Sequence, residues 1–224
     1  MTKTTDKLLE IVALARLKGA NAPRSYLGTS GLGESCDRAL WYSYKQPKNP
    51  DKAIVFRKFD VGHALEPVLI NWLKTAGITF FDSPDGNQFG FEDGVIQGHV
   101  DGVIKGIPYD EDTAYLFEAK TSNEHYFKNF VKEGIQCNEK YLIQVHVYMH
   151  KMHLKKCLFA VVNKNTQDLY FEIVELDEFI AISALNRGHA IAEMEEIPDR
   201  KYETKAYFKC KLCSYYSECW KQDQ

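Results

Sequence analysis

Residues 98–121 read GHVDGVIKGIPYDEDTAYLFEAKT. The first eight and the last eight of these residues are rich in β-branched and aromatic side chains, and a Gly-, Pro- and Asp-rich turn separates them, a pattern typical of a β-hairpin. Side chains two positions apart in a strand point to the same side, so Glu118 and Lys120 share a face while Ala119 points into the core. If the two strands pair, Asp101 lies opposite Glu118.

The rest of the chain alternates between two kinds of hydrophobic pattern. Helical spacing of apolar residues predicts helices over about 5–18, 36–42, 51–75, 140–153 and 176–197. Short β-rich runs between turn residues predict strands at 78–81, 88–91, 94–105, 114–121, 156–163 and 169–176. Pro67 is expected to kink or break its helix. This order predicts one α/β domain over residues 1–224, with a mixed central sheet flanked by helices.

The composition of the chain is that of a globular protein. Of 224 residues, 45% are hydrophobic and 26% are charged, which excludes disordered and fibrous classes. Apolar runs are far shorter than the ~20 residues needed to span a bilayer, and Glu10 and Arg16 interrupt the N-terminal apolar segment, unlike a signal peptide. We therefore expect a cytoplasmic protein, in the host cytoplasm if it is phage-encoded, with no membrane partner.

Charge is distributed unevenly along the chain. The net charge is −3, but residues 82–118 hold nine acidic residues and one lysine, while residues 120–156 hold seven lysines and three glutamates. An acidic site beside a basic surface is typical of a cation-dependent enzyme that acts on a polyanion. Solvated loops and helix faces with uneven charge would give the same pattern.

The hairpin residues suggest a metal-dependent hydrolytic site. The carboxylates of Asp101 and Glu118 are hard oxygen ligands suited to Mg²⁺ or Mn²⁺. A coordinated water loses its proton more readily than bulk water and becomes a nucleophile near neutral pH. Lys120 could orient or deprotonate that water, or stabilise the charge that develops at phosphorus. The alternative is an exposed aspartate beside a surface Glu–Lys pair.

Two helical motifs extend this set. In GHALE, His63 and Glu66 are three residues apart and face the same way on a helix, where the histidine could ligate a metal and the glutamate support that metal or a second one. In QVHVY, Gln144 and Tyr148 share a helix face and could contact a phosphate or the lysine. Taken alone, both motifs would also suit ordinary helix packing.

The cysteines suggest a second metal centre. There are six of them: Cys36, Cys137, Cys157, Cys210, Cys213 and Cys219. The last three form a C-x₂-C-x₅-C motif, Cys36 is the candidate fourth ligand, and the other two are expected to be free. Four thiolates suit a [4Fe–4S] cluster or a tetrahedral Zn²⁺, and spacing alone does not separate these. A clasp between residue 36 and residues 210–219 would close a loop of roughly 170 residues, which indicates a structural role.

In order and spacing, GHALE, GHVDGV, EAK and QVHVY resemble the motifs of the PD-(D/E)xK nuclease superfamily, in its RecB-like exonuclease branch. Val100-Asp101 stands where the family has Pro-Asp. An early Cys followed by Arg, with a terminal C-x₂-C-x₅-C, is similar to the iron–sulfur subgroup of that branch. This subgroup includes the CRISPR-associated exonucleases of the fourth Cas family and the nuclease modules of AddB-type helicase–nucleases. The resemblance runs from Cys36 to Cys219.

The resemblance implies a restriction-endonuclease-like core and a C-terminal Cys-rich tail that a [4Fe–4S] cluster clasps to an N-terminal helix. It implies metal ligation by His63, Asp101, Glu118 and the backbone carbonyl of Ala119, with Glu66 as a weaker match. It makes Lys120 the catalytic base or the water-positioning group, with Gln144 and Tyr148 supporting the substrate and the lysine.

These inferences predict a Mg²⁺- or Mn²⁺-dependent exonuclease that hydrolyses DNA ends in recombination, repair or CRISPR-type processing. The alternatives are a structure-specific or nicking endonuclease on the same site, and a non-catalytic iron–sulfur DNA-binding subunit. No P-loop motor motif is present, so the substrate would be single-stranded or end-frayed DNA, unless a helicase or recombination partner or a homo-oligomer assists. The candidates for phosphate contacts are Arg38, Lys128, Lys132, Lys140, Lys151, Lys155 and Lys156.

Overall fold

The computed structural model describes residues 3–83 and 88–221. The helices are α1 (Lys3–Lys18), α2 (Thr29–Leu32), α3 (Asp37–Lys45), α4 (Ala53–Thr75), α5 (Glu124–Glu133), the 3-10 helix η1 (Gly134–Cys137), α6 (Glu139–Lys151), α7 (Glu178–Glu193), α8 (Phe208–Leu212) and α9 (Tyr216–Trp220). The strands are β1 (Leu27–Gly28), β2 (Thr79–Phe80), β3 (Gly90–Asp93), β4 (Ile96–His99), β5 (Gly102–Lys105), β6 (Tyr115–Ser122), β7 (Lys156–Asn163) and β8 (Leu169–Glu175).

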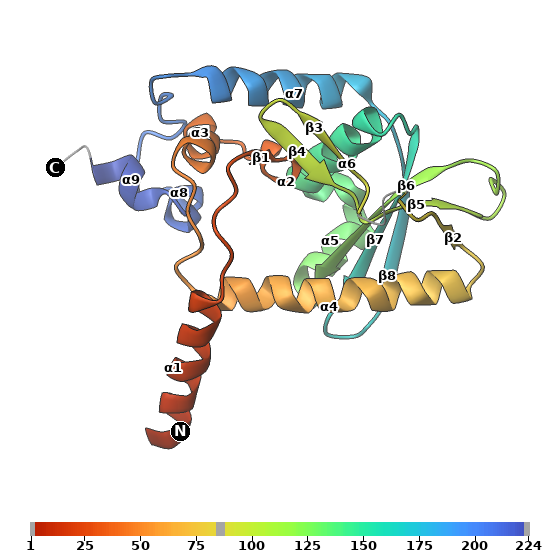
Figure 1. Cartoon of the computed structure of the whole chain (residues 1–224), viewed down its shortest axis with the longest axis horizontal. Coiled ribbons are helices and arrows are strands. Elements are labelled where there is room, and N and C mark those ends of the chain that lie inside the picture. Colours follow the sequence, from red (N-terminus) through yellow and green to blue (C-terminus); the bar gives the residue numbers. More distant parts are fainter. Residues whose placement is uncertain (1–2, 84–87, 222–224) are drawn as a thin grey trace.

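The larger sheet has five strands in the order β2-β5-β6-β7-β8. β6 and β7 run parallel, and the other neighbouring strands are antiparallel. A parallel pair needs a long crossover connection, which α5, η1 and α6 provide. The predicted mixed sheet flanked by helices is therefore confirmed, with α4 on one side of the sheet and α5 and α6 on the other (Figure 1).

Two hydrophobic cores hold these helices on the sheet. On one face, Phe130 of α5 and Met149 of α6 belong to the same buried cluster as Phe159 of β7. On the other face, Leu69 of α4 packs in a cluster with Leu158 of β7. Neighbouring residues of β7 thus enter different cores, which explains why the segment KCLFAVVN is apolar at nearly every position.

A smaller sheet with the order β1-β4-β3 lies beside the larger one. The sequence pattern predicted one continuous strand over 94–105, and this prediction was wrong. The chain bends at Val100 and Asp101, so that β4 joins the small sheet and β5 the large one. Asp101 therefore lies at the bend between two strands rather than inside one. A local alternation of apolar residues does not reveal that a strand changes sheets.

The bend lies at a crowded place where only a glycine fits. A Cβ atom on Gly98 of β4 would lie 2.4 Å from Thr29 Oγ1 and 2.5 Å from Tyr148 Cε1. The missing side chain lets α2 and α6 approach β4 closely. The strand that leads into Asp101 is thereby held between two helices.

The predicted helices and strands are present, with ends shifted by a few residues. Pro67 lies inside α4, which continues without a break. The sequence analysis missed β1, α2, α5, η1, α8 and α9. Most of these are very short, but α5 has a readable start, because the Asn123 side chain accepts a hydrogen bond from the Tyr126 amide as an N-cap. Among the described residues, no helix combines the length and apolar character that crossing a bilayer requires.

We expect Gly98→Ala to lower the free energy of unfolding by about 1–3 kcal/mol, because the added methyl group overpacks the contact with Thr29 and Tyr148. Urea denaturation followed by circular dichroism measures the change. Gly31→Ala is the matched control, since its Cβ would have nothing nearer than Leu40 Cδ1 at 4.0 Å. Equal denaturation midpoints for the two variants would contradict this account of the bend.

Candidate active site

The β5–β6 hairpin brings the predicted site residues together. Its register pairs Gly102 with Phe117, so the next position along places Asp101 beside Glu118. The amide of Ala119 donates a hydrogen bond to Asp101 Oδ2 at 2.8 Å. Lys120 Nζ forms an ion pair with Glu118 Oε1. The structure thus groups these side chains at the point where β4 bends into β5.

The Glu118 carboxyl group is buried and only half satisfied. Its side chain is 1% exposed, and Oε2 has no hydrogen-bond partner among the described residues. The pKa of Glu118 is raised to about 8, chiefly by burial, with Asp101 and Glu66 also raising it and Lys120 lowering it. A buried acceptor without a partner is rare in native proteins, and it marks a position where a cation or a water would bind.

Asp101 and Glu66 share this environment. Burial raises the pKa of Asp101 above its usual range, while Lys120, the Ala119 amide and His63 lower it. Glu66 is half-buried on α4, and burial followed by repulsion from Asp101 raises its pKa to about 7. Carboxyl groups from α4, the bend and β6 therefore lie within electrostatic range of one another, and Lys120 is a cation that lowers the pKa of each of them.

Lys120 is held in this carboxyl-rich site as a cation. Although burial alone would lower its pKa, the charges of Glu118 and Asp101 hold the pKa above its ordinary value. The Tyr141 ring, at the start of α6, lies with its centroid 5.1 Å from Lys120 Nζ. The lysine is therefore fixed between carboxyl groups on one side and an aromatic face on the other.

The chemistry of this donor set fits a divalent cation. Mutually repelling carboxyl groups and the unpartnered Glu118 Oε2 are what a hard cation such as Mg²⁺ or Mn²⁺ would satisfy. Within the described residues, however, no three His, Cys, Asp or Glu side chains are already drawn together as a metal-binding group. In this arrangement the Lys120 ammonium serves as the counter-ion of Glu118.

The other two predicted ligands, His63 and Glu66, lie on α4, which crosses over the sheet at β6. At Gly62 a Cβ atom would lie 3.8 Å from Thr121 Oγ1, so the helix runs close over β6 at this point. The next residue, His63, is exposed and near enough to Asp101 to lower the pKa of that carboxyl group. His63 and Glu66 thus lie within electrostatic range of Asp101, and their role as metal ligands stays a prediction.

Gln144 and Tyr148 lie on one face of α6, but they are buried and contact each other. Gln144 Nε2 donates a hydrogen bond to the Tyr148 hydroxyl at 3.2 Å. Burial, followed by the charge of Glu118, raises the pKa of Tyr148 to about 12. Both side chains are buried and are not open to a phosphate. Tyr141, which the sequence analysis missed, precedes them at the same helical spacing and is the residue of α6 that reaches Lys120.

The predicted DNA-binding residues are all engaged with other protein groups. The lysines pair as Lys128–Glu124, Lys132–Glu133, Lys140–Glu34, Lys151–Asp93, Lys155–Glu178 and Lys156–Asp110. Arg38 Nε donates a hydrogen bond to the Pro198 carbonyl at 2.6 Å. Lys156 begins β7, beside the start of β6, whereas Lys120 lies near the end of β6. The structure therefore does not bring Lys151, Lys155 and Lys156 to the carboxylates.

The four cysteines of the predicted clasp line one cavity of about 670 Å³. They are free thiols, and Cys137 lines the same cavity while Cys157 is buried in β7. Burial raises the pKa of Cys210 and Cys213, and the charges of Cys36 and Cys219 raise both values further. The thiols therefore lie within electrostatic reach of one another. No three of them form a ready metal-binding group within the described residues, so the iron–sulfur assignment stays a prediction.

Protein contacts hold the C-terminal tail against α3. The rings of Tyr42 and Tyr215 stack with centroids 5.5 Å apart, and Lys48 Nζ forms an ion pair with Glu218 Oε1 at 2.8 Å. Arg38 Nη1 lies 3.9 Å from Cys219 Sγ. These contacts hold the two ends of the predicted clasp next to each other.

Solved structures share this fold at low sequence identity. An alkaline exonuclease of Laribacter hongkongensis, LHK-Exo, is 14% identical with a TM-score of 0.55, covering 75% of this chain and 86% of that one. Its complex with dAMP is 16% identical with a TM-score of 0.51, covering 79% and 87%. The protein SSO0001 is 16% identical with a TM-score of 0.50, covering 97% and 96%. No protein-family model and no curated protein sequence matches the chain.

These similarities define the class of fold. The chain has the restriction-endonuclease-like α/β core expected from its motifs, and it shares that core with an exonuclease. These similarities do not show that the chain belongs to the RecB-like iron–sulfur branch. That membership stays a prediction.

A buried histidine ties α6, which supports the site, to α7. The Asp177 amide donates a hydrogen bond to His146 Nδ1 at 3.0 Å, so the imidazole must be neutral there. Burial lowers the pKa of His146, and the Asp177 carboxylate opposes this only in part. The unfolded chain therefore binds a proton below about pH 6.5 that the folded chain does not take up. The contribution of His146 to stability is lost as the pH falls below that value.

We expect the urea midpoint of the wild type to fall more between pH 7.5 and pH 5.5 than that of His146→Asn. The asparagine oxygen can replace Nδ1 as the acceptor but does not titrate. Comparing the two proteins at both pH values cancels the other titrating groups. The same loss of midpoint in both would show that His146 does not contribute to the acid sensitivity.

Proposed function

We propose that the chain is a divalent-metal-dependent exonuclease that hydrolyses phosphodiester bonds at DNA ends. The observation that carries the proposal is the buried, half-satisfied Glu118 carboxyl group beside Asp101 and Lys120. Buried acceptors without a partner are rare, and at Glu118 the nearby charges of Asp101 and Glu66 add to what a bound cation would satisfy. LHK-Exo, which shares the fold, is an exonuclease and was solved with dAMP, a deoxynucleotide. That favours DNA as the substrate.

In this proposal, Asp101, Glu118, the Ala119 carbonyl and His63 would hold a Mg²⁺ or Mn²⁺ ion, with Glu66 beside them. Such an ion, when bound, acts as a Lewis acid on the phosphate and lowers the pKa of coordinated water. The chain's own contribution is to place these ligands on a rigid bend and strand, where they need no reorganisation during the reaction.

Lys120 would act directly on the reacting phosphate. Its ammonium group pairs with Glu118 and its side chain is 18% exposed, so it can donate to a phosphate oxygen or to the attacking water. The Tyr141 face restricts where that ammonium can point. Gln144 and Tyr148 would be positioning residues, because they are buried against each other and Tyr148 lies within electrostatic range of Glu118.

We further propose that residues 1–224 form one nuclease domain, in which Cys36, Cys210, Cys213 and Cys219 hold a [4Fe–4S] cluster, or Zn²⁺ as the alternative. The shared cavity and the contacts between the tail and α3 support this assignment. With no P-loop motif in the sequence, the substrate would be single-stranded or end-frayed DNA. Recombination, repair or CRISPR-type processing would supply such ends, with a helicase partner or self-association as options.

We expect Mn²⁺, added at 100 times its Kd for the folded protein, to raise the Tm of the wild type by roughly 5–10 °C. An ion that binds only the folded state stabilises that state. Glu118→Gln should abolish the shift by removing the buried ligand charge. Asp112→Asn is the matched control, since Asp112 is an exposed carboxylate in the same acidic stretch. Differential scanning fluorimetry with and without EDTA gives the readout. An equal shift in all three proteins would place the ion elsewhere.

The activity test uses anaerobically purified protein with end-labelled linear DNA, single- and double-stranded, and a covalently closed circle. We expect Mn²⁺- or Mg²⁺-dependent degradation of linear DNA only, reduced about 100- to 1000-fold in Lys120→Ala. Lys7→Ala, whose lysine is exposed and pairs with Glu10, should retain activity. Cutting of the circle would make the protein an endonuclease. Binding without any metal-dependent cleavage would leave a DNA-binding subunit.

A further inference from the structure

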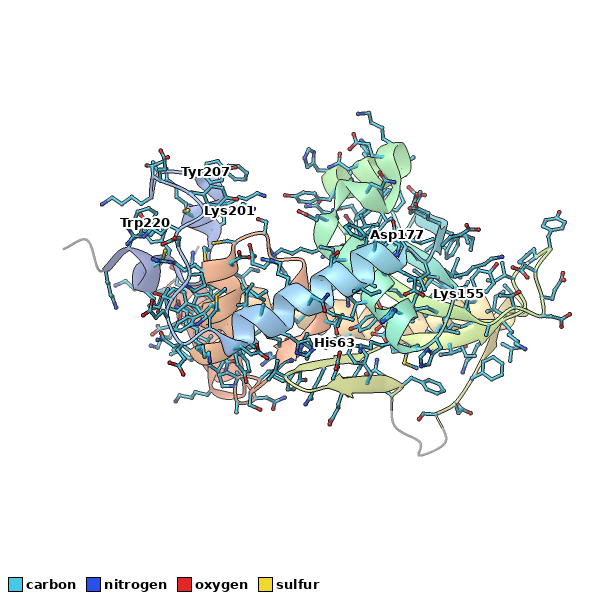
Figure 2. All side chains as sticks on the ribbon, turned by 90° about the horizontal axis from the view of Figure 1, so that it is seen from above. His63, Lys155, Asp177, Lys201, Tyr207 and Trp220 are labelled. Carbon is cyan, nitrogen blue, oxygen red and sulfur yellow. The ribbon has the colours of Figure 1, made fainter. Side chains whose placement is uncertain are left out.

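The cavity that the four cysteines line also extends to α5, η1 and the start of α6, a part that the metal prediction does not use. One wall comes from α3 and the C-terminal segment, defined here as residues 200–221, and the other from α5, η1 and the start of α6. In Figure 2 the C-terminal segment, with Lys201, Tyr207 and Trp220 labelled, and α5 rise on the same side of the molecule. We call this cavity the aromatic cleft.

Aromatic side chains line both walls of the aromatic cleft. They are Tyr42, Tyr126, Tyr202, Tyr215, Tyr216 and Trp220. Tyr42 and Tyr215 are buried against each other and belong to the core. Tyr126, by contrast, is 60% exposed on α5, and Tyr202 stacks on Tyr207 with centroids 4.1 Å apart. Accessible rings on facing walls are a surface on which planar groups can stack.

The C-terminal segment is basic, unlike the chain as a whole. It contains six lysines and arginines and two glutamates, a net charge of +4, against −3 for the whole chain. Lys205, Lys209 and Lys211 are exposed and form no ion pair with any residue that the structure describes. Lys209 lines the aromatic cleft itself. These lysines differ from the six lysines first expected to contact phosphates, which all pair with acidic residues.

The aromatic cleft adjoins the candidate active site. Asn138 and Lys140 line it at the start of α6, and the next residue, Tyr141, carries the ring beside Lys120. At the other end of the same wall, the Tyr126 amide donates to Asn123 Oδ1 at 3.0 Å, and Asn123 directly follows the end of β6. The wall formed by α5, η1 and the start of α6 therefore leads to the end of the strand that holds Lys120.

We propose that the aromatic cleft binds a single-stranded segment of the DNA substrate, with bases stacking on Tyr126 and Tyr216 and a phosphate contacting Lys209. Stacking on protein rings requires unpaired bases, because in a duplex each base face is already covered by its neighbours. Every base has such a face, so this site tolerates any sequence. The proposal rests on the proposed nuclease function only in taking DNA to be the polymer that reaches Lys120.

The experiment measures binding by fluorescence anisotropy, using anaerobically purified wild type in EDTA and a 15-nucleotide oligothymidylate or a duplex of equal length. We expect Tyr126→Leu to weaken single-strand binding by about 5- to 150-fold, the loss of one base stack. Lys209→Gln should lower the salt dependence of log K by about 0.7, the loss of one phosphate contact. Tyr109→Leu is the matched control, because Tyr109 is a fully exposed tyrosine on the β5–β6 loop.

In the cleavage assay, Tyr126→Leu should raise KM for the oligothymidylate and leave kcat within about twofold, because Tyr126 touches bound DNA and not the reacting phosphate. If both Tyr126→Leu and Lys209→Gln bind the oligothymidylate with wild-type affinity, the proposal that the cleft binds DNA is wrong, even if the wild type cleaves DNA. Tighter binding of duplex than of single strands would overturn it as well. Loss of binding in these variants, with a wild type that never cleaves, would support the cleft and refute the proposed nuclease function.

Discussion

Burial of the Glu118 carboxyl group in the middle of the five-stranded sheet is the constraint on which the rest of the site depends. Taking a carboxylate out of water is strongly unfavourable unless partners replace the water. Lys120 satisfies one oxygen and the other has no partner among the described residues. A sheet position with an apolar residue would be more stable, so the carboxyl group at this place indicates chemistry rather than folding.

The fold meets this constraint by dividing one stretch of chain between two sheets. The bend between β4 and β5 turns Asp101 toward Glu118, and the crowded contact at Gly98 holds the bend against α2 and α6. α4 covers the opposite face and adds Glu66. The acidic group is thereby assembled from elements that hydrophobic packing already holds in place. The C-terminal segment returns to α3 and places Lys209 and several tyrosines in a cavity that the start of α6 also lines.

Tertiary contacts override a local sequence pattern at several places. The segment 94–105 alternates like one strand, but its two halves pair with different partners. The lysines at 151, 155 and 156 form a basic run in the sequence, yet each faces a carboxylate brought from elsewhere, as with Lys156 and Asp110. Gln144 and Tyr148 have the predicted spacing, but burial directs them to each other.

The sequence by itself determined the grouping of Asp101, Glu118 and Lys120, because the two-residue period of a strand and the register of a hairpin are local properties. It also determined the mixed α/β architecture, since helical and strand periodicities alternate along the chain. Only the tertiary structure decided that Tyr141 reaches Lys120, which lysines remain unpaired, and that α5 and the C-terminal segment face each other across one cavity. These depend on contacts between segments far apart in the chain, which no local pattern encodes.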